Sequence, residues 1–337
     1  MKTHKNIPIF IPHEGCKNNC IFCSQTKITG VACSEKTILA EVENVKKIVA
    51  ESLDTIDGSY NEIAFFGGSF TGIERERMIA LLDAASRFIG AKISGIRLST
   101  RPDYIDSEIC EILKNYGVTA VELGIQSTND DVLCANKRGH LSCAGEKASL
   151  LIKKSGFSLT GQMMTGMYTS SPSDEIKTAI DIVSYGADSA RIYPTVVFAS
   201  TPLYELTIAG KYVPMTIDEA ITRTADCTQI FIDSNVKLLR IGLHSSENLK
   251  EAPFGANHPA LGELVEGEIY FKKICDLLKT KKIGENITVY APKGEISKAV
   301  GQKQKNKQRL IKEFGLKRLI FRECDTLEKY VVRVKDN

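Results

Sequence analysis

Short apolar runs alternate with longer segments of helical periodicity through the first 242 residues of the chain. Strands that alternate with helices in this way pair in parallel, with the helices packed on the sheet. Seven strand candidates, of which about six would enter the barrel, predict an α/β fold: an incomplete, TIM-like (β/α)6 barrel that is open on one side. The predicted strands cover residues 7–13, 62–66, 95–99, 118–124, 157–164, 189–197 and 236–242, and the helices between them cover residues 35–52, 73–89, 106–115, 128–154, 174–185 and 217–233.

Three cysteines follow the first predicted strand in a C-x3-C-x2-C spacing, at Cys16, Cys20 and Cys23. A short loop can aim three thiols at one point, and that geometry suits a metal. A closed structural zinc site needs four ligands, whereas a [4Fe–4S] cluster held by three thiolates keeps one iron open. The alternative interpretation is a zinc knuckle completed by His13 or Cys33, or a fortuitous cluster.

The cysteine spacing resembles the signature of the radical S-adenosylmethionine (SAM) superfamily. The resemblance implies that Cys16, Cys20 and Cys23 ligate a [4Fe–4S] cluster and that its open iron binds SAM. It also implies an electron donor such as flavodoxin or ferredoxin. SAM would then be cleaved to a 5′-deoxyadenosyl radical, which abstracts a hydrogen atom from the substrate of a lyase or a transferase.

Motifs at the ends of later predicted strands resemble the SAM contacts of the same superfamily. Gly67 and Gly68 allow a close approach to the backbone because they lack a Cβ, and Ser69 stands where an acid is usual. The planar guanidinium of Arg138 is expected to pair with the SAM carboxylate. For each polar residue the simpler alternative is a turn, a strand-end cap or a surface charge. The expected cofactor contacts are Gly67, Gly68, Ser69, Ser99, Arg101, Gln126, Arg138 and Thr195.

Further motifs resemble the branch that contains the Elongator catalytic subunit and the oxygen-independent coproporphyrinogen oxidases, and the similarity covers residues 7–265. The chain departs from that branch at Gln162 and Thr165, where His and Pro are frequent. The sequence shows no sign of an acetyltransferase-like domain, so we expect a reaction other than the full Elongator reaction. The matching motifs are Gln162–Gly166, Arg191–Thr195, Thr201–Tyr204, Arg240–His244 and His258–Glu263.

The substrate-side residues are sought at or beyond the carboxyl ends of the predicted strands. We expect Glu14, Tyr193 and His244 to be catalytic, with a structural role as the alternative for a loop histidine. The favoured substrate is a nucleobase-type small molecule, and queuine lyase, which cleaves the side arm from a 7-deazaguanine base, is the specific hypothesis. The second hypothesis is a tRNA-modifying enzyme, and the third is a non-catalytic iron–sulfur or RNA-binding protein.

The C-terminal segment has the order strand, loop, helix, strand, which resembles a KH RNA-binding core. Its loop, Gly301–Gln304, lacks the second glycine of the Gly-x-x-Gly pattern. Basic residues around a single acid, Glu313, predict a face that binds RNA, and a solvated helix packed over the barrel is the alternative. We therefore expect a barrel (1–245), a connecting segment packed on it (246–286) and a small KH-like α+β segment (287–337). The basic residues are Lys303, Lys305, Lys307, Arg309, Lys312, Lys317, Arg318 and Arg322.

Composition limits the location and the partners of the chain. With 43% hydrophobic and 25% charged residues, the 337-residue chain has the composition of a globular protein. It contains no signal peptide and no apolar run of about 18 residues, and its other cysteines are scattered, so we expect a cytoplasmic protein without a membrane partner. The net charge of +3 is too small to indicate a nucleic-acid partner by itself.

Overall fold

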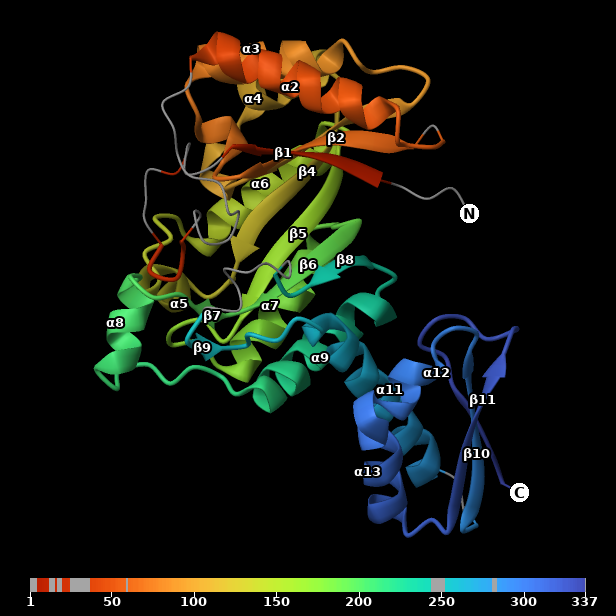
Figure 1. The fold of residues 1–337 in the computed structure, drawn as a ribbon. Helices are drawn as coiled ribbons and strands as arrows, with labels where there is room; N and C mark the ends of the chain where they lie inside the picture. The colour runs from red at the N-terminus through yellow and green to blue at the C-terminus, as the bar shows by residue number, and fades with distance from the viewer. Residues whose placement is uncertain are drawn as a thin grey trace.

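The structure is a computed structural model of the chain. It describes residues 5–11, 16, 20–24, 37–58, 60–243, 252–280 and 284–336. Figure 1 shows a large curled sheet with helices around it and a smaller C-terminal unit beside it. Within the described ranges, no helix combines the length and the apolar character needed to cross a membrane.

A seven-stranded parallel sheet forms the larger part of the molecule. The strands follow one another in chain order, and the sheet curls into a half-barrel in which β1 and β8 are the edge strands among the described residues (Figure 1). The open, parallel α/β barrel is confirmed, but all seven strand candidates enter the sheet instead of about six, because the last one also pairs in parallel. The strands are β1 (Lys5–Ile11), β2 (Asn61–Gly67), β3 (Ile93–Thr100), β4 (Val118–Gln126), β5 (Ser158–Thr165), β6 (Ser189–Pro194) and β8 (Lys237–Ile241).

The main hydrophobic core lies between this sheet and the helices that connect its strands. Phe65, Leu98 and Leu113 are among its fully buried side chains. Because side chains alternate along a strand, the residues between these core positions face the concave side of the half-barrel, which we call the lumen. The connecting helices are α2 (Ile38–Leu53), α3 (Arg75–Ser86), α4 (Ser107–Asn115), α5 (Asp130–Ala135), α6 (Ser142–Lys154), α7 (Pro172–Ser184), α8 (Pro202–Ile208) and α9 (Ile217–Asp233).

Two predicted elements are divided in the structure. The helical region predicted for residues 128–154 forms α5 and α6, because Lys137 (φ 52°) and Gly139 (φ 76°) adopt left-handed conformations that a helix does not contain. The strand predicted for residues 189–197 ends at Pro194. The next residues form a short strand, β7 (Val196–Val197), which pairs antiparallel with β9 (Phe254–Gly255).

The connecting segment expected at residues 246–286 contains a long helix, α11 (Leu261–Thr280). This helix packs against α9 and also against the helices of the C-terminal unit. Buried Tyr270 fixes the junction, because its hydroxyl donates to Glu295 Oε2 and accepts from the Tyr330 backbone N–H, both at 3.0 Å. The expected boundaries after residues 245 and 286 stay predictions: residues 244–251 and 281–283 lie outside the described ranges, and β10 begins at Asn286.

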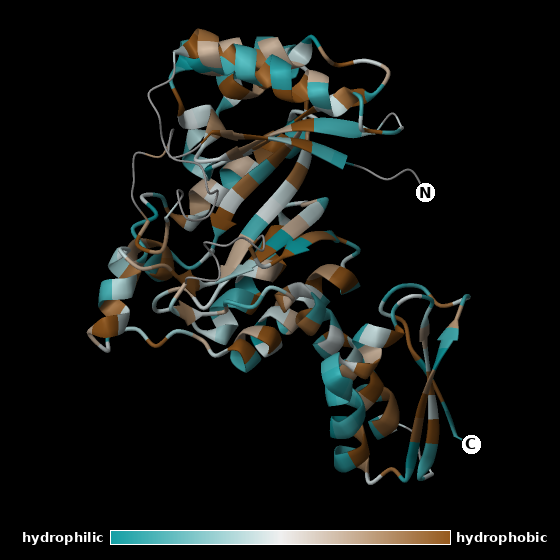
Figure 2. Cartoon of the chain, in the orientation of Figure 1, coloured by the Kyte–Doolittle hydropathy of each residue, from teal (hydrophilic) through white to brown (hydrophobic). Residues whose placement is uncertain are grey.

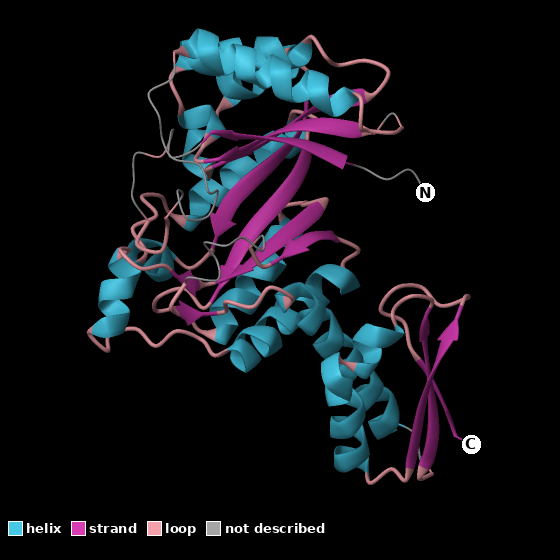
Figure 3. Ribbon diagram, in the orientation of Figure 1, coloured by secondary structure: helices cyan, strands magenta, loops and turns pink. Residues whose placement is uncertain are grey.

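The C-terminal unit is a three-stranded sheet with helices on one face (Figures 1 and 3). Its core joins side chains of α11 to those of the sheet, including Ile274, Leu278, Ile287 and Val289. The loop between its two helices contains Gln304 in a left-handed conformation (φ 61°), at the position where a Gly-x-x-Gly loop has its second glycine. The elements are β10 (Asn286–Pro292), α12 (Ile296–Val300), α13 (Lys305–Phe314), β11 (Arg318–Cys324) and β12 (Arg333–Asp336).

Gly67 permits β1 and β2 to meet closely where the chain enters the cysteine loop. Its φ of +101° favours glycine, and a Cβ at this position would lie 2.5 Å from the carbonyl oxygen of Ile11. Since Ile11 is the last residue of β1 and is paired with Gly67, neither backbone can shift without breaking the ladder. The glycine therefore sets the position from which the cysteine loop starts.

Replacing Gly67 by Ala should lower the free energy of unfolding by about 2 kcal/mol or more, through backbone strain and the contact with Ile11. Gly90→Ala is the matched control, because nothing lies within 4 Å of a Cβ at that exposed glycine. Urea denaturation followed by circular dichroism measures both variants. Equal stability of the two variants would contradict this account of the turn.

Candidate active site

The cysteine loop lies at the carboxyl ends of the first strands of the half-barrel. Cys16 Sγ is 3.3 Å from Ser69 Oγ, which belongs to the turn after β2. Buried Cys20 accepts a hydrogen bond from Arg138 Nη1 at 3.2 Å, and its carbonyl accepts from the Cys23 N–H in a tight turn. Residues that follow three different strands or loops of the barrel therefore meet at these thiols, as the sequence predicted for the reactive edge.

Ile21 fastens the cysteine loop to the barrel through both of its backbone groups. Its N–H donates to the carbonyl of Asn136 at 3.3 Å, and its carbonyl accepts from the N–H of Leu203 at 2.9 Å. The Ile21 side chain is buried in an apolar cluster with Val197, Leu203 and Tyr212. Helix α8, which begins beside Leu203, thus supports the loop from the side opposite α5.

Two buried arginines stand beside the thiols, as expected for a site that binds negative charge. Arg101 forms two hydrogen bonds of 2.9 Å with Asp103 and also donates to the carbonyl of Arg138. Arg138 donates to the carbonyl of Gly124 at 2.7 Å. Burial and the Arg138 charge lower the pKa of His140 to about 4, so its neutral ring can accept from Arg138 while Nδ1 donates to Leu141.

Gln126 reaches the same edge through an unusual backbone conformation. It ends β4 with φ at 67°, next to a register shift in the pairing of β4 with β5. The side chain folds over Gly124, where a Cβ would lie 3.2 Å from Gln126 Nε2. A left-handed, non-glycine residue costs energy, and such residues persist where the surrounding structure demands them, often at functional sites.

These surroundings fit the cofactors that the cysteine spacing implies. The three thiols of the loop would supply the iron ligands, and three buried polar atoms nearby have no hydrogen-bond partner among the described residues: Arg101 Nη1, Arg138 Nε and Gln126 Oε1. Buried polar atoms normally find partners, and SAM offers carboxylate, amino and hydroxyl groups. No three metal-ligating side chains are gathered closely enough to hold a metal ion in the described part of the chain, which excludes residues 12–15 and 17–19 of this loop.

The lumen is lined by a network of buried charges that the sequence analysis did not identify. Glu122 accepts from Arg191 Nη2 and from Gln162 Nε2, both at 2.9 Å, and forms an ion pair in which Arg191 Nε lies 2.8 Å from Glu122 Oε2. Arg97 lies 3.6 Å from Glu122 and 2.8 Å from Glu62. The only sequence signal was the presence of charged residues at lumen-facing positions of strands that are otherwise apolar.

Aromatic rings form the other part of the lumen wall. Phe10 and Phe66 lie on paired positions of β1 and β2, with ring centroids 6.4 Å apart, and Phe10 is 42% exposed. The Arg191 guanidinium lies 5.6 Å from the Phe66 ring centre. Tyr193, a predicted catalytic residue, lies two residues after Arg191 on β6, and burial raises the pKa of its hydroxyl above the ordinary value. Ser99, an expected cofactor contact, lies 3.5 Å from Glu122 on the lumen side.

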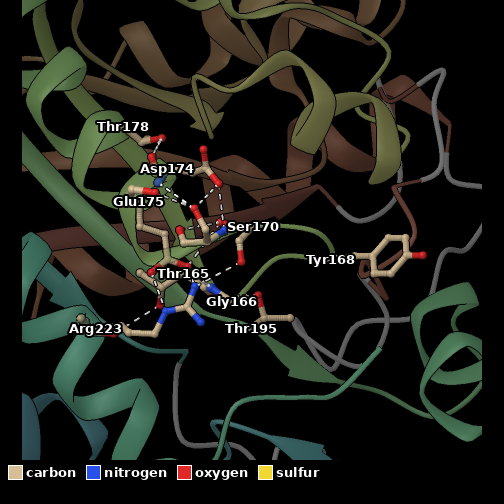
Figure 4. A network of polar contacts seen from close by, with 12 residues as sticks. Thr165, Gly166, Tyr168, Ser170, Asp174, Glu175, Thr178, Thr195 and Arg223 are labelled. Atoms are coloured by element: carbon tan, nitrogen blue, oxygen red, sulfur yellow. Dashed lines mark hydrogen bonds and ion pairs between the residues drawn. The ribbon is translucent and has the colours of Figure 1, made fainter. Parts of the chain in front are cut away.

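Thr195 is fixed by the last residue of β5, next to the loop that follows this strand. Its N–H and its hydroxyl both donate to the carbonyl of Thr165, at 2.9 and 2.8 Å. Buried Glu175 stabilises this region by accepting from the Gly166 N–H at 2.5 Å and from Arg223 Nε at 2.9 Å (Figure 4). Burial raises the pKa of Glu175, and the ion pair with Arg223 opposes that change.

The same loop supports the cysteine loop indirectly. The carbonyl of Tyr168 accepts from Asn136 Nδ2 at 2.9 Å, and Asn136 in turn accepts from Ile21. Thr195, Tyr168 and Asn136 therefore have structural contacts that the sequence did not indicate. Of the predicted catalytic residues, Glu14 and His244 lie outside the described residues, and their roles stay predictions together with those of the cofactor contacts.

Replacing Glu122 by Gln should destabilise the protein by about 3 kcal/mol, because Arg97 and Arg191 would lose the buried negative charge that they share. The matched control is Glu108→Gln, which breaks an exposed 3.3 Å pair with Arg75 and should cost less than about 1 kcal/mol. Urea denaturation of the two variants provides the comparison. If both variants unfold at the same urea concentration, the lumen network does not stabilise the fold.

Comparisons with known proteins agree with this geometry. Residues 10–182 match the profile of the radical SAM superfamily, and residues 187–270 match the radical SAM C-terminal domain. The tRNA uridine(34) acetyltransferase of Methanocaldococcus infernus is 31% identical over 207 residues, which are 58% of this chain and 36% of that protein. Elongator complex protein 3 of Mus musculus is 34% identical over 124 residues, which are 36% of this chain and 23% of that protein. The chain thus spans about a third or less of the length of these two relatives.

A solved structure of similar fold is archaeal Elp3 from Methanocaldococcus infernus. It superposes with a TM-score of 0.61 at 21% identity and covers 80% of this chain and 63% of that one. At this identity the likeness concerns the fold alone. Because the superfamily profile matches more than half of the chain, including the cysteine loop and the edge built around it, the chain belongs to the radical SAM superfamily, whose cofactors are a [4Fe–4S] cluster and SAM.

Proposed function

We propose that this enzyme abstracts a hydrogen atom from a nucleobase-type substrate held in the lumen of the half-barrel. The observation that supports the proposal is the lumen wall, where the exposed ring of Phe10 and the ring of Phe66 lie beside a polar set that includes Gln162 and Arg191. A planar heterocycle requires that combination: a π surface for stacking and fixed donors and acceptors for its edge.

Each of the residues at the half-barrel edge would have a separate role. Cys16, Cys20 and Cys23 would ligate the cluster, and when bound, cluster and SAM supply the 5′-deoxyadenosyl radical. Arg138 would orient the SAM carboxylate, because its Nε is buried and lacks a protein partner among the described residues. Gly68, which also lacks a Cβ, would let SAM approach the backbone of the turn after β2. The Tyr193 hydroxyl, whose pKa is raised by burial, would donate to the substrate in the lumen.

Queuine is our specific candidate among small molecules, with the enzyme as a lyase that separates the cyclopentenyl-amine arm from the 7-deazaguanine base. The base would stack on Phe10, and the carbon that loses hydrogen would face the SAM end of the lumen. The second candidate is a base within tRNA. Two observations favour it: the relatives named above include a tRNA uridine(34) acetyltransferase, and the C-terminal unit carries many cations.

The reconstituted enzyme with dithionite should convert SAM to 5′-deoxyadenosine and methionine. Cys20→Ser should abolish this conversion, because it removes a thiol ligand. Cys143→Ser, at an exposed cysteine outside the loop, should retain it. Chromatography of the products measures the yield, and 5′-deoxyadenosine formation by the Cys20 variant at the level of the parent would contradict the ligand assignment.

The substrate is tested with deuterium. Queuine deuterated on its cyclopentenyl arm should transfer deuterium into 5′-deoxyadenosine, as measured by mass spectrometry, and should release the free deazaguanine base. Unmodified and modified tRNA serve as the second arm of the same assay. Stimulation of SAM cleavage by tRNA without any stimulation by queuine would reject the small-molecule candidate in favour of the tRNA enzyme.

A further inference from the structure

The basic residues around the helix–loop–helix of the C-terminal unit are partly neutralised by acids from other elements. Lys305 lies 2.8 Å from Asp218 on α9. Arg309 pairs with Glu268 on α11 and stacks 3.6 Å from the Phe271 ring centre, and Lys317 pairs with Glu285. The contacts of Lys305 and Arg309 fasten α13 to α9 and α11, and the three pairs together make the face predicted from sequence less cationic than the residue count suggested.

The opposite face of the unit has a different character. In the three-stranded sheet, Tyr290 on the central strand β10 is paired with Arg322 on β11 and with Arg333 on β12. Side chains at paired positions project from the same face of a sheet. The alternate positions, such as Val289 and Val334, are buried under α11 and α13. The face that contains Tyr290 is therefore the one that the helices leave uncovered (Figures 1 and 3).

This uncovered face, which we call the sheet face, combines cations with an aromatic ring. Its exposed cations have no carboxylate partner among the residues that the structure describes, and no acid occupies a position on this face of the described strands. Arg333 lies 5.1 Å from the Tyr290 ring centre. The hydropathy colouring in Figure 2 shows polar residues on these strands among the apolar ones. The exposed cations are Arg318, Arg322, Arg333 and Lys335.

We propose that the sheet face binds a single-stranded segment of RNA. The arrangement of charge suits a polyanion: four cations without a carboxylate partner among the described residues lie on β11 and β12, the strands on either side of β10, and Arg318 and Arg322 are separated by about 13 Å along β11. The ring of Tyr290 among them favours a nucleic-acid strand over an acidic peptide, because an unpaired base can stack on it and on the guanidinium planes.

This inference goes beyond the proposed radical chemistry, because it concerns a surface outside the residues matched by either family profile. It also differs from the KH-like expectation, which placed RNA at the Gly301–Gln304 loop on the helix side. Binding at the sheet face requires neither cluster nor SAM. If RNA does not bind at the sheet face, the prediction of SAM cleavage is unaffected. If SAM is not cleaved, the RNA-binding measurement remains valid.

The test uses the full chain and a fluorescein-labelled, mixed-sequence 12-nucleotide RNA, with anisotropy measured between 50 and 300 mM KCl. The triple variant Arg318→Gln, Arg322→Gln, Arg333→Gln should bind at least about tenfold more weakly at 50 mM salt. The slope of log K against log salt should fall by about 2, since each lost phosphate contact on a single strand removes about 0.7. Tyr290→Ala should weaken binding with little change in that slope.

The matched control carries the same charge change on the helix side, as Lys303→Gln, Lys307→Gln, Lys312→Gln. It should bind RNA within about threefold of the parent chain, and circular dichroism verifies that each variant is folded. Three results would overturn the proposal: no RNA binding by the parent at 50 mM salt, an equal or larger loss in the helix-side variant, or equal competition by polyglutamate of matched charge.

Discussion

The hydrogen bond from Arg138 to Cys20 joins the cysteine loop to the rest of the half-barrel edge, and several features of the site depend on it. Arg138 is placed by the left-handed turn after α5, and its guanidinium also contacts Gly124 at the end of β4. Ile21 is bonded to Asn136, two residues before Arg138. One short segment after β4 therefore sets the positions of a thiol, of the loop backbone and of the buried cation of Arg138.

Charge compensation decides what the lumen can accept. Glu122 receives donors from β5 and β6, and its buried position makes each of these partners necessary. Its side chains hold one another in a rigid wall, in which Arg191 Nε has no hydrogen-bond partner among the described residues. The rings of Phe10 and Phe66 complete the wall on the β1 side. Rigidity of this kind suits an enzyme that must keep a reactive species next to one substrate carbon.

Sequence patterns sufficed for the parts of the fold that repeat locally. Strand and helix periodicity located all seven strands of the sheet, and the three cysteines and Gly67 located the reactive edge. Contacts between residues far apart in the sequence could not be predicted from these patterns. The partners of Glu122 come from residues up to 69 positions away. The left-handed turn at Gln126 has no glycine to signal it, and two glycines within α11 obscured its periodicity. The sheet face could be identified only from the register in which β10 pairs with β11 and β12, and local sequence patterns do not specify that register.

The proposed chemistry requires a cluster with three protein ligands and an iron left open for SAM. Electron paramagnetic resonance of the dithionite-reduced protein, recorded with and without SAM, tests this directly. We predict a [4Fe–4S]⁺ signal whose g-values shift when SAM is added, and loss of the signal in variants with serine at Cys16, Cys20 or Cys23. A reduced cluster whose signal is identical with and without SAM, or a protein that binds only zinc at these thiols, would contradict the account.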